Sequence, residues 1–192
     1  MRSSLSGAAL VLLALVGCDQ AATPPAATPS TSPAVVQKQS LDLGSYTKNQ
    51  TVLELQHYLV LPSDDPLKLR VLFTPDALSD TERQQVLENR SFPGMALFQK
   101  ASPDPARWQW YPYVLVEAHL DRPEVSTENV TSFYVMAYGI EEQNFTDNIS
   151  APSQPGNGFE QLEYRDGLLR MRFAGKADFS DSRAHWDIRV SE

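Results

Sequence analysis

The chain has 192 residues, a net charge of −8 and a single cysteine. A lone cysteine cannot form an intramolecular disulfide, so a buried core rather than covalent bridges must stabilise the fold. The acidic balance argues against a nucleic-acid partner, which would need Lys and Arg gathered on one face, and against direct electrostatic docking on anionic lipid.

The first 17 residues have the pattern of a bacterial secretory signal. Arg2 gives it a positive start, and the apolar stretch that follows is shorter than the roughly 20 residues needed to span a bilayer. Leu15-Val16-Gly17-Cys18 resembles the lipobox of bacterial lipoproteins, because Leu stands three residues before the cysteine and a small residue directly before it. The resemblance implies diacylglycerol transfer to the Cys18 sulfur, cleavage before Cys18 and acylation of the new N-terminus. The alternative is an ordinary secretory signal with a chance cysteine at its end.

Acylation of Cys18 predicts a lipid-anchored protein of the bacterial cell envelope that faces the periplasm. Asp19 favours the inner membrane, as in lipoproteins of enteric bacteria, and the outer membrane is the alternative. Residues 18–40 are rich in Ala, Thr, Ser and Pro and predict a disordered linker. Residues 41–192 predict a single β-rich globular domain.

The first elements of this domain are predicted as strands. Residues 41–46 are a weak candidate. Residues 51–61 alternate as a strand does, although Thr51 and Glu54 have the spacing of a helical capping box. Residues 67–73 alternate more clearly, with an apolar residue at every odd position.

The next segment predicts one short surface helix. Ser79 and Glu82 have capping-box spacing, and the polar run that follows ends near Asn89. The largely apolar run from Met95 to Gln99 predicts a brief strand.

Arg107 to Leu120 is the strongest predicted strand, with Trp108 and Trp110 on one face. Pro112 cannot donate to a sheet, so it predicts an edge strand or a bulge at that point. Residues 130–138 are apolar on both faces and predict a central strand.

Residues 141–158 predict a long polar loop, and a hairpin follows it. Asp166-Gly167 lies between two alternating runs, which predicts a tight two-residue turn. The register that follows pairs Arg165 with Leu168, Tyr164 with Leu169, Glu163 with Arg170 and Leu162 with Met171. The apolar pairs then share one face and the charged pair lies on the other. A last strand is predicted over 185–190.

Seven or eight mainly antiparallel strands with one short helix predict an all-β fold. A β-sandwich fits best, and a small β-barrel is the alternative.

No local motif predicts a catalytic residue, a metal site or a cofactor. His57, His119 and His185 lie far apart and lack metal-ligand spacing. The chain has no Gly-x-Ser-x-Gly motif and no glycine cluster that could hold phosphate. An acylated Cys18 could not act as a nucleophile.

Tyr111 and Tyr113 are the only suggestion of a ligand site in the globular domain. They are predicted on the strand face opposite Trp108 and Trp110, where two solvated rings could stack on a sugar or anchor a protein. The alternative is that both faces of the strand are covered.

The sequence therefore predicts a non-enzymatic protein-interaction or assembly module, whose partners are the membrane, through acyl chains on Cys18, and an envelope protein. A glycan- or small-solute-binding lipoprotein, using the Tyr111 and Tyr113 strip or a cavity between the sheets, is the alternative. An envelope hydrolase assembled from distant strands is the third.

Overall fold

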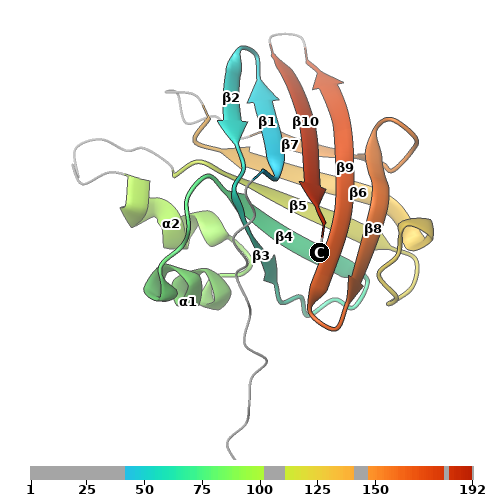
Figure 1. Ribbon diagram of the computed structural model, residues 1–192, viewed down its shortest axis with the longest axis horizontal. Helices are drawn as coiled ribbons and strands as arrows, with labels where there is room; N and C mark the ends of the chain where they lie inside the picture. Colours follow the sequence, from blue (N-terminus) through green and yellow to red (C-terminus); the bar gives the residue numbers. More distant parts are fainter. Residues whose placement is uncertain (1–41, 102–110, 141–146, 180–181, 192) are drawn as a thin grey trace, which may run out of the picture. The chain divides into compact units, whose positions relative to one another are not determined.

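The computed structural model describes residues 42–101, 111–140, 147–179 and 182–191, which belong to one compact unit over Ala34–Glu192. Their strands form two five-stranded antiparallel sheets that face each other (Figure 1). Each sheet keeps two separate edge strands, so the predicted β-sandwich is confirmed and the barrel alternative is wrong. Cys18 and Asp19 lie outside the described residues.

Sheet A has the order β2-β1-β10-β9-β8 and sheet B the order β3-β4-β5-β6-β7. The strands of sheet A are β1 (Gly44–Lys48), β2 (Thr51–Glu54), β8 (Gly158–Arg165), β9 (Leu168–Asp178) and β10 (Arg183–Val190). The strands of sheet B are β3 (His57–Leu61), β4 (Lys68–Thr74), β5 (Tyr113–Leu120), β6 (Val130–Tyr138) and β7 (Asp147–Pro152).

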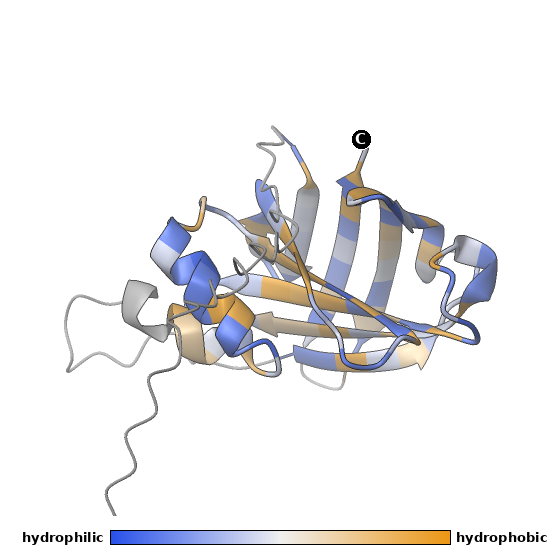
Figure 2. Cartoon of the chain, turned by 90° about the horizontal axis from the view of Figure 1, so that it is seen from below, coloured by the Kyte–Doolittle hydropathy of each residue, from blue (hydrophilic) through white to orange (hydrophobic). Residues whose placement is uncertain are grey.

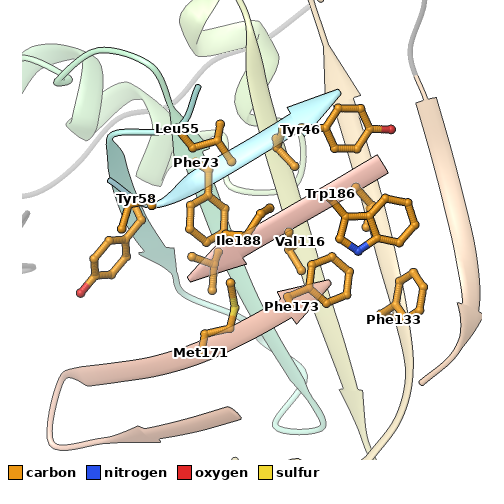
Figure 3. Packing of buried hydrophobic residues seen from close by; sticks show 14 of the residues in the cluster. Tyr46, Leu55, Tyr58, Phe73, Val116, Phe133, Met171, Phe173, Trp186 and Ile188 are labelled. Carbon is orange, nitrogen blue, oxygen red and sulfur yellow. The ribbon is translucent and has the colours of Figure 1, made fainter. Parts of the chain in front are cut away.

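The main core fills the space between the sheets, and aromatic rings dominate it (Figure 3). Trp186 and Phe173 of sheet A stack with their ring centroids 5.6 Å apart. Phe133 of sheet B meets Phe173 edge to face at 5.1 Å. Such pairs add to the stabilisation that the burial of apolar surface already gives.

The segment 51–61 is extended, as alternation favoured, but it is two strands in two sheets. Leu55 accepts and donates backbone hydrogen bonds in sheet A, whereas the Gln56 amide donates to the Thr74 carbonyl in sheet B. The alternation of core-facing residues also shifts by one position here. Leu55, at an odd position, and Tyr58, at an even one, both lie in the main core. Leu59 instead faces the opposite side of sheet B, because that side is covered as well.

A helical layer covers the outer face of sheet B. It consists of α1 (Asp80–Glu88) and α2 (Pro93–Ala101). Val86 of α1 and Leu97 of α2 join a second buried cluster with residues of β3, β4, β5 and β6. Sheet B is therefore buried on both faces where this layer lies, whereas Asn148 and Ser150 of β7 stay exposed. No helix among the described residues is long and apolar enough to span a membrane.

The start of α1 confirms the predicted capping box. Ser79 Oγ accepts a hydrogen bond from the Glu82 amide, and the Glu82 side chain accepts one from the Ser79 amide. The C-cap is Asn89, where the helix was predicted to end.

The predicted strand over Met95 to Gln99 is wrong, because these residues belong to α2. A run of four apolar residues, Met95 to Phe98, fits a buried strand and a buried helix equally well. Pro93 opens the helix at its first position, where a missing amide is harmless.

Two further predictions need correction. The predicted loop 141–158 contains β7, which pairs with β6 at the edge of sheet B; residues 141–146 lie outside the described residues. Pro112 marks neither an edge strand nor a bulge, because it precedes β5, and β5 lies between β4 and β6. Residues 107–110 lie outside the described part of the chain.

The hairpin and the central strand are confirmed. Asp166 and Gly167 have φ values of 53° and 82°, as a type I′ turn requires. The pairing of β8 with β9 has the predicted register. Strand β6 lies between β5 and β7, as its two apolar faces predicted.

The outer face of sheet A is polar. Figure 2 shows hydrophilic and hydrophobic bands alternating along its strands, as expected for a sheet with one solvated face. Ion pairs cross this face between β8 and β9, including Arg172 with Glu160 at 2.8 Å.

Candidate functional site

The connection from β5 to β6, residues 121–129, forms a strap that is held by its own hydrogen bonds. Asn129 is buried, and its side-chain amide donates to the Glu124 carbonyl at 2.9 Å. The Asp121 amide donates to the Asn129 carbonyl at 2.9 Å and closes the base of the strap. A short 3₁₀ helix over Thr127–Asn129 leads into β6.

The strap is fastened to β8, the edge strand of sheet A. Thr127 Oγ1 accepts from the Leu162 amide at 2.7 Å and donates to the Leu162 carbonyl at 3.3 Å. Ser126 forms an isolated antiparallel bridge with Glu163. The strap therefore satisfies backbone groups that an edge strand would otherwise offer to another chain.

An open groove of about 880 Å³ runs along the seam between the strap and β8. One wall is residues 123–128 and the other is residues 161–165. Val125 and Tyr164 in these walls are half-buried and pack against the main core, so they give the groove apolar surface. Ribbon views place the strap beside β8 at one end of the sandwich (Figure 1).

The groove is acidic. Glu124 and Glu128 are exposed and have no ion-pair partner among the described residues. Glu163 has an exposed ion pair with Arg170 at 3.5 Å, and Arg165 one with Asp166 at 3.7 Å. Carboxylates thus outnumber cations in the lining.

A second hollow, of about 310 Å³, lies beside the turn between β3 and β4. Arg70, which is buried, donates from Nε to Glu117 Oε1 at 2.7 Å and from Nη1 to the Arg90 carbonyl. Arg90 Nη2 donates to Asp64 Oδ1 at 2.6 Å, and Lys68 lies 3.7 Å from Asp65. Every cation in this hollow has a carboxylate partner. We therefore interpret the hollow as a set of ion pairs that hold β4 and β5 to the helical layer.

Tyr111 and Tyr113 form no solvated strip: the alternative of a covered face holds, because both side chains are buried under the helical layer. Tyr113 stacks on Tyr138 at 4.9 Å, and the Tyr111 hydroxyl donates to Asp76 at 3.1 Å. Burial raises the pKa of both phenols, and the charge of Asp76 adds to the effect at Tyr111. Solvent does not reach this face of β5, because α2 packs over it, where a strand was predicted.

The three histidines lie on three different strands. His57 is on β3, His119 on β5 and His185 on β10. His119 Nε2 lies 3.6 Å from Glu117 Oε2. Among the described residues, no three His, Cys, Asp or Glu side chains form a group that could hold a metal ion.

Sequence reasoning missed Thr127, Glu124 and Glu128 as site residues. The only local signal was a polar, Pro-containing connection between two strands, which is typical of most loops. The partner of Thr127 is 35 residues away in the chain, so only the fold reveals its role.

Comparisons with family models, with curated proteins and with solved structures found no match to this chain. The fold and the groove therefore stand on the geometry above.

Proposed function

We propose that the chain is a lipid-anchored protein of the bacterial cell envelope whose globular domain is a non-enzymatic protein-interaction module. Cys18 would carry the acyl chains, and the linker of residues 18–40 would hold the domain away from the membrane surface. The domain would face the periplasm, with the inner membrane favoured by Asp19.

The groove between the strap and β8 is the observation that carries this proposal. It is an open, preformed surface at the edge of a sheet, with polar and apolar groups side by side. Protein-binding surfaces combine these features, whereas small-molecule pockets enclose most of their ligand.

The alternatives have less support. The glycan- or solute-binding hypothesis relied on Tyr111 and Tyr113, which are covered, or on a cavity between the sheets, a space that the main core occupies. The hydrolase hypothesis required a histidine, an acidic residue and a serine in one cleft. The groove is lined by Ser126 and carboxylates, and none of its described lining residues is a histidine.

The anchor is tested by Cys18→Ser. We expect this variant to lose palmitate labelling and to leave the membrane fraction, because serine has no sulfur to accept the diacylglycerol that would anchor the protein. A Cys18→Ser protein that is still labelled would refute the lipoprotein assignment.

The interaction role is tested by photocrosslinking in cells that make the acylated protein. A photoreactive residue at Glu128, in the groove, should give a discrete adduct with another envelope protein. The matched control places the same residue at Lys176, on the outer face of sheet A, or at Gln84, on α1. Equal adducts at all three positions, or none at Glu128, would contradict the proposal.

A further inference from the structure

The shape of the groove fits an extended chain. One wall is the end of strand β8, residues 161–165, and the other is the bent strap, residues 123–128, which runs into the 3₁₀ helix; the two walls are joined at the Ser126–Glu163 bridge. Five residues of strand span about 16 Å at about 3.3 Å per residue, so the groove could accommodate a peptide segment of similar length. A compact small molecule would leave most of such an open groove unfilled.

The walls are fixed before any partner arrives. Thr127 is bonded to both backbone groups of Leu162, and Asn129 holds the Glu124 carbonyl. A preformed groove loses little conformational entropy when it binds, and this loss is a main cost of peptide recognition.

The charge of the groove selects a basic occupant. Glu124 and Glu128 line the strap side, and no described cation pairs with them; Glu163, in its exposed pair with Arg170, adds a third carboxylate on the β8 side. Val125 and Tyr164 offer apolar surface between them. A matching segment would carry Lys or Arg side chains alternating with apolar ones, since alternate residues of an extended chain point to opposite sides.

We infer that this groove binds a basic, extended segment of a protein partner. The inference rests on the proposed function and names the partner's chemistry at the same site. A contact of about five residues is weak by itself. Anchoring of both proteins in one membrane would raise their effective concentration and make a weak contact sufficient.

The test uses the full-length acylated protein in nanodiscs of phosphatidylcholine, a lipid without net charge. The probe is a fluorescein-labelled peptide of alternating Lys and Val residues, and the control peptide has Glu in place of Lys. Fluorescence anisotropy gives the Kd at low and high salt. We expect the Lys peptide to bind, the Glu peptide to fail, and high salt to weaken binding.

The decisive variant is the double substitution Glu124→Gln and Glu128→Gln, which leaves the exposed side chains nearly isosteric. We expect it to raise the Kd for the Lys peptide about tenfold, because two exposed charge contacts between the groove and the peptide are lost. The matched control, Glu54→Gln with Glu88→Gln, removes two exposed carboxylates elsewhere and should leave the Kd unchanged. Equal Kd values for the two double variants, or equal binding of both peptides, would overturn the inference.

Its failure can be distinguished from failure of the proposed function. A specific photocrosslink at Glu128 without binding of the Lys peptide would overturn the basic-segment inference and support the interaction role. Groove-dependent binding of the Lys peptide without any crosslink in cells would support the inference about chemistry and overturn the envelope partnership.

Discussion

Lys48 and Asp147 form an ion pair between the two sheets, with Lys48 Nζ 2.9 Å from Asp147 Oδ1 and both side chains buried. Lys48 ends β1 in sheet A, and Asp147 begins β7 in sheet B. The Tyr46 hydroxyl donates to the second carboxylate oxygen at 2.9 Å. These contacts join residues 99 and 101 positions apart and lock one end of the sandwich.

Asp147→Ala should lower the free energy of unfolding by about 3–5 kcal/mol, because it leaves the Lys48 ammonium buried beside a cavity. Urea denaturation measures this loss. The control is Arg189→Ala, which breaks an exposed pair with Asp187 and should cost no more than about 1 kcal/mol. The double variant Lys48→Met/Asp147→Leu should lose less than the sum of its single substitutions. Equal losses for Asp147→Ala and Arg189→Ala would show that the pair does not stabilise the interface between the sheets.

Gly94→Ala should loosen the helical layer. A Cβ at this position of α2 would lie 2.5 Å from the Tyr113 hydroxyl oxygen and 3.1 Å from Tyr113 Cε1. We expect a loss of about 1–3 kcal/mol in thermal or urea unfolding. Tyr113→Phe removes the clashing oxygen, so it should recover part of that loss in the double variant. Met95→Ala, on an exposed side chain of the same helix, should change stability by less than about 0.5 kcal/mol.

Thr127→Val should expose the edge of sheet A. The valine has nearly the shape of threonine but satisfies neither the amide nor the carbonyl of Leu162, at a cost of about 1–3 kcal/mol. Freed edge groups also favour pairing with a second chain, so analytical ultracentrifugation should detect concentration-dependent association. Thr127→Ser keeps the hydroxyl and should stay monomeric. If Thr131→Val, which removes one exposed bond to the His119 carbonyl, behaves like Thr127→Val, the strap does not protect the edge.

The domain should lose stability at alkaline pH. Burial raises the pKa of Tyr46, Tyr111 and Tyr113 above the ordinary value of 10.0, and the charge of Asp147 adds to this at Tyr46. Because these phenols ionise first in the unfolded chain, their contribution is complete below about pH 10 and is lost as the pH rises further. Each phenol should contribute a slope of up to about 1.4 kcal/mol per pH unit in that range.

Urea midpoints measured at a series of pH values give this slope, and phenolate absorbance should rise together with unfolding. Tyr46→Phe should reduce the slope by the share of one phenol. Phenolate absorbance that appears near pH 10 while the domain stays folded would show that these hydroxyls reach solvent.

Some elements were predictable because short-range chemistry decides them. The Asp166-Gly167 turn needs two residues that tolerate positive φ, and the Ser79–Glu82 capping box needs two side chains three positions apart. Alternation placed Trp186, Ile188 and their neighbours in the core, because a strand has only two faces.

Other features could not be read from local pattern. Residues 95–99 form a helix because Leu97 packs against sheet B, and their own sequence does not distinguish that helix from a strand. Alternation alone leaves open whether Tyr113 faces solvent, and that same helix buries it. Asp147 lies in the segment predicted as a long polar loop, yet it is the buried partner of Lys48.

The sequence by itself determined the all-β class, the hairpin with its register and the first helix, since each depends on residues a few positions apart. The lipid-attachment site at Cys18 stays a prediction. Only the tertiary structure decided which faces are covered, where the edge of sheet A is sealed and where the acidic groove lies. Those features come from pairs such as Thr127 with Leu162, whose contact exists only after both sheets have formed. Non-local contacts of this kind depend on the packing of the whole chain, and no single segment encodes them.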